Sequence, residues 1–225
     1  MLRYILWFPG WLTICAVLSV MFSLPVGQET IFMGIPPVIL IGEVDLMQVG
    51  KWTALCGVPL LANGVILERS RQIELFSVLR VKKCLFLRAR EVYACVACTF
   101  AWAVGVFGAS AWQLGGSKAI RIFILLLPNL LLWDGVGLAS YALCKKTTWS
   151  GGISLALIGG SCLIGVHLPS WIPYLPSTWG MLSQTGPYNA LGSLPVMSVA
   201  SSLSAVVCYF VFIIHKENEN GNHRN

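Results

Sequence analysis

Charged residues are scarce in this sequence. Only 11% of its 225 residues are Asp, Glu, Lys or Arg, whereas soluble globular domains have roughly 25%. Hydrophobic residues make up 56%, and they come in long runs separated by short polar stretches. This composition excludes an ordinary soluble fold. It predicts an all-α integral membrane protein with one transmembrane domain, residues 1–215, and a polar tail, residues 216–225.

The sequence also lacks the motifs of common catalytic, metal and nucleic-acid sites. It has no Gly-x-x-x-x-Gly-Lys-Ser/Thr loop for nucleotide phosphates, and its three histidines and its carboxylates form no set suited to hydrolysis. Cys95 and Cys98 are spaced as Cys-x-x-Cys, but they lie in an apolar run without further ligands at metal-site spacing. The basic residues do not alternate with aromatic residues as in a nucleic-acid-binding face. We therefore expect no catalytic residue, no metal, no directly bound cofactor and no nucleic-acid partner.

Six apolar runs are candidates for transmembrane helices, because about 20 apolar residues cross the bilayer core. They are residues 4–24, 47–67, 92–114, 120–144, 151–166 and 196–214. The fifth run is short and rich in glycine. Residues 25–46 and 167–195, both with several prolines, are predicted to be external.

The basic residues predict the orientation of these spans. Six crossings place both termini on one side, and with the termini in the cytoplasm twelve of the fifteen Lys and Arg residues are cytoplasmic. Only Lys51, Lys118 and Arg121 fall outside. Because cytoplasmic loops carry an excess of Lys and Arg, we expect a multi-pass protein of the plasma membrane with both termini in the cytoplasm.

The connection after the second span is strongly basic. Ile73, Phe76 and Leu79 recur at nearly helical spacing, while Arg69 and Glu74 fall on the other side. This pattern predicts a short amphipathic helix on the cytoplasmic surface. The alternative is a loop whose basic residues only anchor it to anionic lipid.

A resemblance to a known family begins at this segment. A second span that ends in Glu-Arg, a helix of the form Ile/Leu-Glu-Leu-x-x-x-Leu, and a Lys-x-x-x-Leu leading into the third span resemble the coupling-helix region of type-2 ABC exporter permeases. The matching residues are Glu68, Arg69, Ile73, Glu74, Leu75, Leu79, Lys83 and Leu87. The resemblance extends to the six spans and to a re-entrant external segment between the fifth and sixth.

The resemblance implies a non-catalytic permease subunit. Its expected partners are two cytoplasmic ABC ATPase subunits, which bind ATP and Mg²⁺, a second permease subunit, identical or related, and the lipid bilayer. The residues expected to couple it to the ATPase are Glu68, Arg69, Ile73, Glu74, Phe76 and Leu79. Small permeases of this make-up resemble the group that exports antimicrobial peptides (lantibiotics and bacteriocins) or confers immunity to them, which implies an amphipathic or peptide substrate. The interface helix that commonly precedes the first span is nearly absent here.

Two further sets of residues are candidates for a functional site. Asp134, with Asn129 five residues before it, lies within the fourth span, where an ionisable group is expensive and often marks a transport pathway. A structural hydrogen bond is the alternative. Trp171, Tyr174 and Trp179 lie in the proline-rich external segment and either form an interfacial aromatic belt or a gate over the exit of a pathway.

Two other functions stay open. A small secondary transporter or an intramembrane enzyme would use Asp134, although the sequence offers it no second intramembrane carboxylate or histidine. A four-span claudin-like structural protein would need a cysteine pair in the first external loop, and residues 25–46 contain no cysteine.

Overall fold

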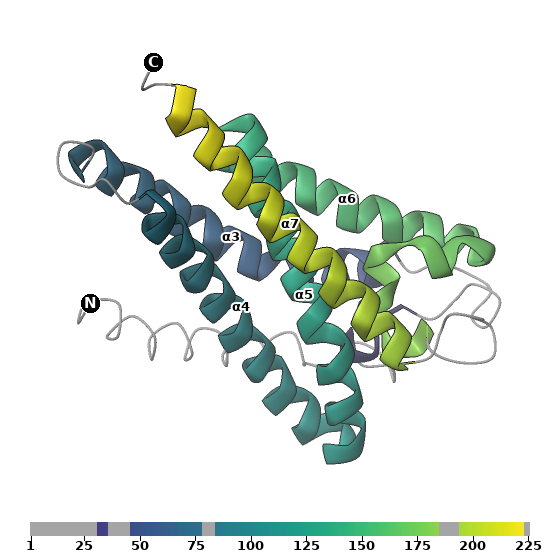
Figure 1. The fold of residues 1–225 in the computed structure, drawn as a ribbon. Helices are drawn as coiled ribbons and strands as arrows, with labels where there is room; N and C mark the ends of the chain where they lie inside the picture. The colour runs from purple at the N-terminus through teal and green to yellow at the C-terminus, as the bar shows by residue number, and fades with distance from the viewer. Residues whose placement is uncertain (1–30, 36–45, 78–83, 185–193, 223–225) are drawn as a thin grey trace.

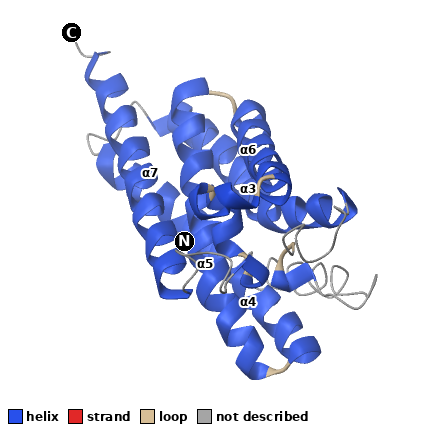
Figure 2. Ribbon diagram, turned by 90° about the vertical axis from the view of Figure 1, so that its right-hand side faces the viewer, coloured by secondary structure: helices blue, strands red, loops and turns tan. Residues whose placement is uncertain are grey.

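The computed structural model describes residues 31–35, 46–77, 84–184 and 194–222. Within these ranges every element is a helix and there is no strand (Figure 2). The predicted first span, residues 4–24, lies outside the described residues, and so does Leu79.

Five long helices form the bundle (Figure 1). They are α3 (Leu46–Ser77), α4 (Cys84–Leu114), α5 (Gly116–Cys144), α6 (Thr147–His167) and α7 (Leu194–Asn222). Short 3-10 helices complete the structure: η1 (Ile31–Met33), η2 (Pro169–Tyr174), η3 (Pro176–Gly180) and η4 (Leu182–Gln184).

Four of the long helices are long and apolar enough to cross a membrane: Leu46–Glu68 of α3, Ala89–Leu114 of α4, Gly116–Cys144 of α5 and Pro195–His215 of α7. The prediction of an all-helical chain with apolar, membrane-length helices is confirmed for these four, and they indicate a membrane protein. The predicted fifth span is a helix, α6, but its apolar stretch, Trp149–Gly165, is shorter. Six crossings are therefore not confirmed.

The helix α3 extends beyond its apolar part. The sequence predicted a separate amphipathic helix after the second span, whereas residues 68–77 continue α3 without interruption. No proline or glycine occurs between Glu68 and Ser77 to end the helix. A separate coupling helix is thus not confirmed, and the basic segment begins as the last turns of α3.

Helix α5 lies at the centre of the bundle and contacts α3, α4, α6 and α7. Its connections are very short, since only Gly115 separates it from α4 and only Lys145 and Lys146 separate it from α6. Gly115 and Lys145 have positive φ angles of 83° and 57°, which let the chain reverse within one or two residues.

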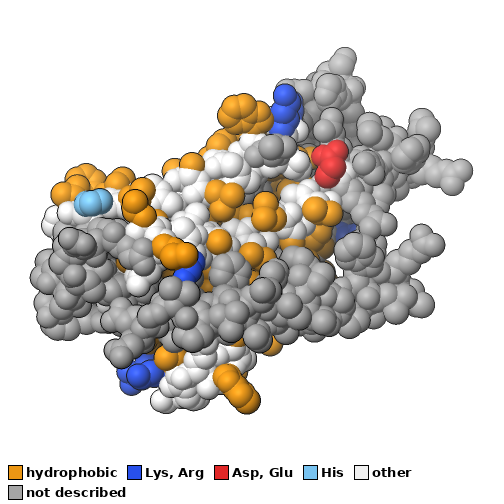
Figure 3. Space-filling model, turned by 180° about the vertical axis from the view of Figure 1, so that it is seen from behind, with side chains coloured by type: hydrophobic (Ala, Val, Ile, Leu, Met, Phe, Trp, Pro, Cys, Tyr) orange, Lys and Arg blue, Asp and Glu red, His pale blue; other side chains and the backbone are white. Residues whose placement is uncertain are grey.

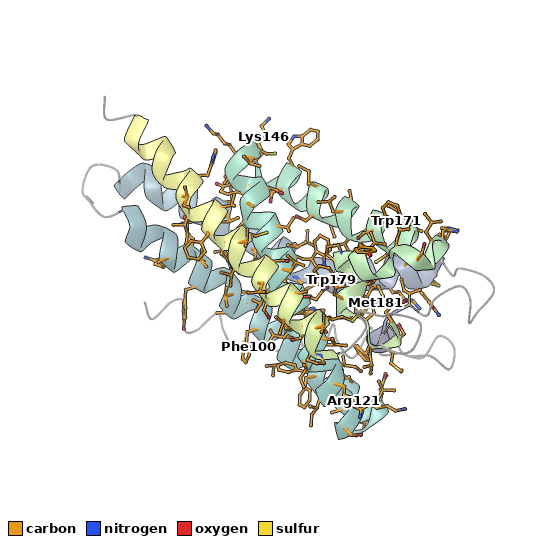
Figure 4. All side chains as sticks on the ribbon, turned by 45° about the vertical axis from the view of Figure 1, so that its right-hand side comes forward. Phe100, Arg121, Lys146, Trp171, Trp179 and Met181 are labelled. Carbon is orange, nitrogen blue, oxygen red and sulfur yellow. The ribbon has the colours of Figure 1, made fainter. Side chains whose placement is uncertain are left out.

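Two hydrophobic clusters show that the helices alternate in direction. One cluster joins α3, α4, α5 and α7 where α3 and α7 approach their ends, and it contains Leu67, Cys95, Leu138, Tyr141 and Phe212. The other reaches the opposite end, where Phe32 and Ile35 pack with Met181. We call the first end the basic end and the second the capped end; Figure 4 shows Lys146 and Arg121 far apart, at the two ends of α5.

Much of the described surface between the ends is apolar. Figure 3 shows hydrophobic side chains spread over one face, with few charged ones among them. Large exposed side chains include Phe100 and Trp112 of α4 and Leu203 and Phe210 of α7. In water such a surface would promote aggregation, whereas in a bilayer it faces lipid.

Candidate functional site

A buried polar cluster surrounds Asp134 in the middle of the bundle. Asp134 lies on α5, ten residues before the end of that helix at Cys144. At 1.5 Å per residue this is about 15 Å from the helix end, close to half the roughly 30 Å hydrocarbon core. The side chain is 1% exposed, so its hydrogen-bonding needs must be met by protein.

Three neutral side chains meet the carboxylate of Asp134. Asn63 of α3 donates a hydrogen bond from Nδ2 to Oδ1, and Tyr209 of α7 donates from its hydroxyl to Oδ2 over 2.7 Å. The buried Thr99 of α4 lies close to this carboxylate, and its hydroxyl has no hydrogen-bond partner among the described residues. One group on each of the four membrane-length helices therefore converges at a single point.

Glycines beside Asp134 allow this convergence. A Cβ on Gly135 would lie 2.9 Å from Cβ of Cys208, and one on Gly137 would lie 3.0 Å from Cδ2 of Leu60. Both distances are too short for a side chain at those positions. The glycines let α7 and α3 approach α5 closely, and such close approach drives helix packing where lipid provides no hydrophobic effect.

A second polar connection joins α5 to η2–η4, which we call the external segment after the sequence prediction for residues 167–195. Asn129 is fully buried; it donates from Nδ2 to the carbonyl oxygen of Pro176 over 2.6 Å and accepts from Nε1 of Trp133 over 3.2 Å. Gly180 packs so closely on Asn129 that a Cβ there would lie 2.8 Å from its amide. Asn129 and Asp134 thus share a helix but have separate partners.

Other contacts hold the external segment against the bundle. The hydroxyl of Ser161 on α6 donates to Oγ of Ser177 over 2.6 Å, and Gln184 donates from Nε2 to the carbonyl oxygen of Ile35 over 2.5 Å. The backbone N–H of Ile35 also points at the sulfur of Met181, 3.4 Å away. The two predicted external regions therefore meet at the capped end.

The predicted aromatic gate residues lie in two environments. Trp171 and Tyr174 of η2 are exposed, while Trp179 of η3 is half-buried; Figure 4 shows Trp171 at the outer side of this segment and Trp179 nearer the bundle. The small residues between them, Ser177 and Thr178, are buried.

The predicted ATPase-coupling residues lie at the basic end. Glu68 is exposed, and Arg69, Ile73, Glu74 and Phe76 belong to the last turns of α3. Ser70, within the same stretch, donates a hydrogen bond to the buried Glu91 of α4. This bond joins the extension of α3 to the first turns of α4.

Sequence reasoning missed Asn63, Thr99 and Tyr209 as partners of Asp134. A signal for two of them was present: Asn63 is the one Asn, Gln or charged residue between Trp52 and Glu68, and Tyr209 is the one tyrosine of the last span. Their convergence on Asp134 could not be predicted, because it depends on how the helices rotate against one another.

Comparisons with protein families, curated proteins and solved structures found no match to this chain. Its function must therefore be argued from its own residues.

Proposed function

We propose that this chain is the membrane-spanning permease subunit of an ATP-driven exporter of the type-2 ABC kind. It crosses the plasma membrane six times, with both termini in the cytoplasm, and pairs with a second permease and two ATPase subunits. One observation supports this proposal best. The basic extension of α3 and the Pro/Trp segment η2–η4, the two features on which the resemblance rests, lie at opposite ends of the bundle.

The basic end supplies a surface for an ATPase. Residues 68–77 extend α3 by about 15 Å beyond its apolar part, far enough to leave the hydrocarbon core. The extension is tied to α4 through Ser70 and Glu91. A push on it is therefore carried into two spans at once.

The external segment supplies a re-entrant element. Asn129, which holds Pro176, comes eight residues after the exposed Arg121 on α5, a rise of about 12 Å. If Arg121 lies at the headgroup level, η3 dips about that far into the membrane. Backbone without α-helical hydrogen bonds is tolerated at such depth only where protein covers it, and the buried Ser177, Thr178 and Gly180 meet this condition.

Two separate polar contacts, both made by α5, link these two elements in the proposed mechanism. Asn63 of α3 binds Asp134 of α5, and Asn129 of α5 binds Pro176 of the external segment. Closure of the ATPases moves α3, and α5 passes that motion to the segment that covers the exit. The exposed Trp171 and Tyr174 at the exit suit an amphipathic peptide that leaves at the membrane surface.

The test is to purify the tagged chain from its native membrane and measure Mg²⁺-dependent ATP hydrolysis in the eluate. We expect the wild type to retain an ATPase and the double variant Ile73→Glu with Phe76→Glu to lose it, because two acidic side chains replace the apolar face that docks. Lys118→Glu, an exposed change at the capped end, serves as control and keeps the ATPase. Equal ATPase activity in the double variant and the wild type would overturn the proposal, provided that both elute as monodisperse protein.

A second candidate is a small secondary transporter, or an intramembrane enzyme, centred on Asp134. The observation that favours it is the burial of this carboxylate among neutral groups from three neighbouring helices, α3, α4 and α7. The two candidates differ in energy source. Transport that continues after ATP is exhausted, and that stops in Asp134→Asn, would favour the second.

A further inference from the structure

Among the described residues that surround it, the carboxylate of Asp134 has no cationic partner. Asn63, Thr99 and Tyr209 are all neutral, and so are Ser150 and Ser154 of α6, whose hydroxyls lie near Gly137. A bare negative charge at this depth is strongly unfavourable. A small cation would remove that cost.

Oxygen atoms suited to such a cation are already present. Besides the carboxylate, the hydroxyls of Thr99 and Tyr209 lie close to it, and the Asn63 side chain, which donates to it through Nδ2, also carries a carbonyl oxygen. Hard cations such as Na⁺ prefer carboxylate, carbonyl and hydroxyl oxygens. Each of the four membrane-length helices provides one of these ligands.

The amide of Asn63 has an acceptor that no described residue uses. Asn63 is 3% exposed, and its Oδ1 accepts no hydrogen bond within the described part of the chain. A buried acceptor without a donor destabilises the fold. Rotation of the amide by 180° exchanges Nδ2 for Oδ1 and turns the oxygen toward Asp134. The oxygen can then coordinate a cation, or accept a hydrogen bond from the protonated carboxyl group.

We propose that Asp134, Asn63, Thr99 and Tyr209 form an intramembrane site for one small monovalent cation, Na⁺ or H⁺. The bound cation neutralises Asp134 and holds the four helices together at one point. Its release leaves an unbalanced charge between α3 and α7 and loosens their contact with α5. The site does not require an ATPase partner, so its test is independent of the test of the exporter proposal.

Few titratable groups face the site in the part of the chain that the structure describes. They are Asp134 itself, Cys95 and Cys98 on α4, and Tyr209 on α7 with Cys208 next to it, packed on Gly135. On α3 and α6 the facing groups, Asn63 and the serines, do not titrate. Substitution of Asp134 therefore separates its protonation from that of the thiols.

The experiment measures the thermal unfolding of the purified full-length chain in lipid nanodiscs, followed by tryptophan fluorescence. Melting temperatures are compared in NaCl, KCl and choline chloride at equal ionic strength, at pH 6 and pH 8. If the cation is Na⁺, NaCl raises the wild-type melting temperature by a few degrees over choline, with saturation. If it is H⁺, the pH 6 samples are more stable than those at pH 8 whatever the salt. In both cases D134N loses the response.

The control variant is E91Q, which makes the same carboxylate-to-amide change at the buried Glu91 near the basic end, and it keeps the wild-type response. Should D134N fail to fold, T99V and Y209F replace it, and each should raise the half-saturating NaCl concentration, or shift the pH response, several-fold. The cation site would be overturned if the melting temperatures of the wild type and D134N responded equally to salt and pH. It would also be overturned if T99V and Y209F both kept the wild-type response.

Discussion

Gly135 illustrates how single residues set the spacing of this bundle. It lies next to Asp134 on α5 and faces Ala205 and Cys208 of α7. With hydrogen as its side chain, α7 comes close enough for Tyr209 to reach the carboxylate. The polar site therefore depends on a neighbour that makes no polar contact itself.

Substitution of this glycine tests that dependence. In Gly135→Ala the new Cβ would lie 2.9 Å from Cβ of Cys208 and 3.2 Å from the carbonyl oxygen of Ala205, so α7 must shift. We expect a loss of about 1–3 kcal/mol in the free energy of unfolding, measured by denaturation in mixed micelles. Gly160→Ala on α6 is the matched control, because a Cβ at that position would have no atom within 4 Å, and its stability should be unchanged or slightly higher. Equal effects of the two substitutions would contradict close packing of α5 and α7.

Among the short elements, the external segment η2–η4 depends on Asn129 for its position. In Asn129→Ala the bonds to Pro176 and Trp133 are lost, and the side chain that packs on Gly180 is shortened. We expect the backbone amides of residues 177–181 to exchange with deuterium faster, because a membrane hydrogen bond worth about 0.6–1.7 kcal/mol is lost.

Ser202→Ala is the control for that experiment, because the Ser202 hydroxyl bonds within its own helix, to the carbonyl oxygen of Ser198. It should leave exchange in the external segment unchanged. Unaltered exchange in Asn129→Ala would mean that Asn129 does not hold the segment.

A disulfide can test the docking of the same segment on α6. The hydroxyls of Ser161 and Ser177 lie 2.6 Å apart, so Ser161→Cys with Ser177→Cys should form a disulfide under mild oxidation. Because the native Cys162 also lies beside Ser177, both double variants carry Cys162→Ala. The variant that pairs Gly160→Cys with Ser177→Cys should then form no disulfide, since nothing lies within 4 Å of the Cβ position of Gly160. Mass spectrometry of the joined peptides identifies the cross-link, and equal cross-linking of both pairs would contradict the docked arrangement.

Element by element, the sequence predicted the membrane-length helices well. The apolar runs 47–67, 92–114, 120–144 and 196–214 agree with the four helices within a few residues, because composition alone decides where a chain can cross lipid. The length of α3 was not predicted, since amphipathic periodicity does not show whether a helix is separate from the preceding span or continues it. From its cost in lipid, Asp134 was expected to face either protein or water. The sequence did not predict that protein buries it or which side chains contact it, because these depend on tertiary packing.

For the molecule as a whole, the difference between the two ends is the central feature. The extension of α3, the lysines after α5 and the end of α7 lie at the basic end. The short helix η1 and the segment η2–η4 lie at the capped end. Both the exporter proposal and its re-entrant segment require the basic end in the cytoplasm. The charge distribution predicts this orientation.

The most direct test of that orientation is sided labelling with a membrane-impermeant maleimide. Ser170 is exposed in η2 at the capped end, and Cys144 is a natural exposed cysteine at the basic end. In intact cells, Ser170→Cys should add a labelled site to the wild-type pattern, and in inside-out vesicles Cys144→Ala should remove one. A Ser170→Cys site that reacts only in inside-out vesicles, or a Cys144 that reacts in intact cells, would contradict the account.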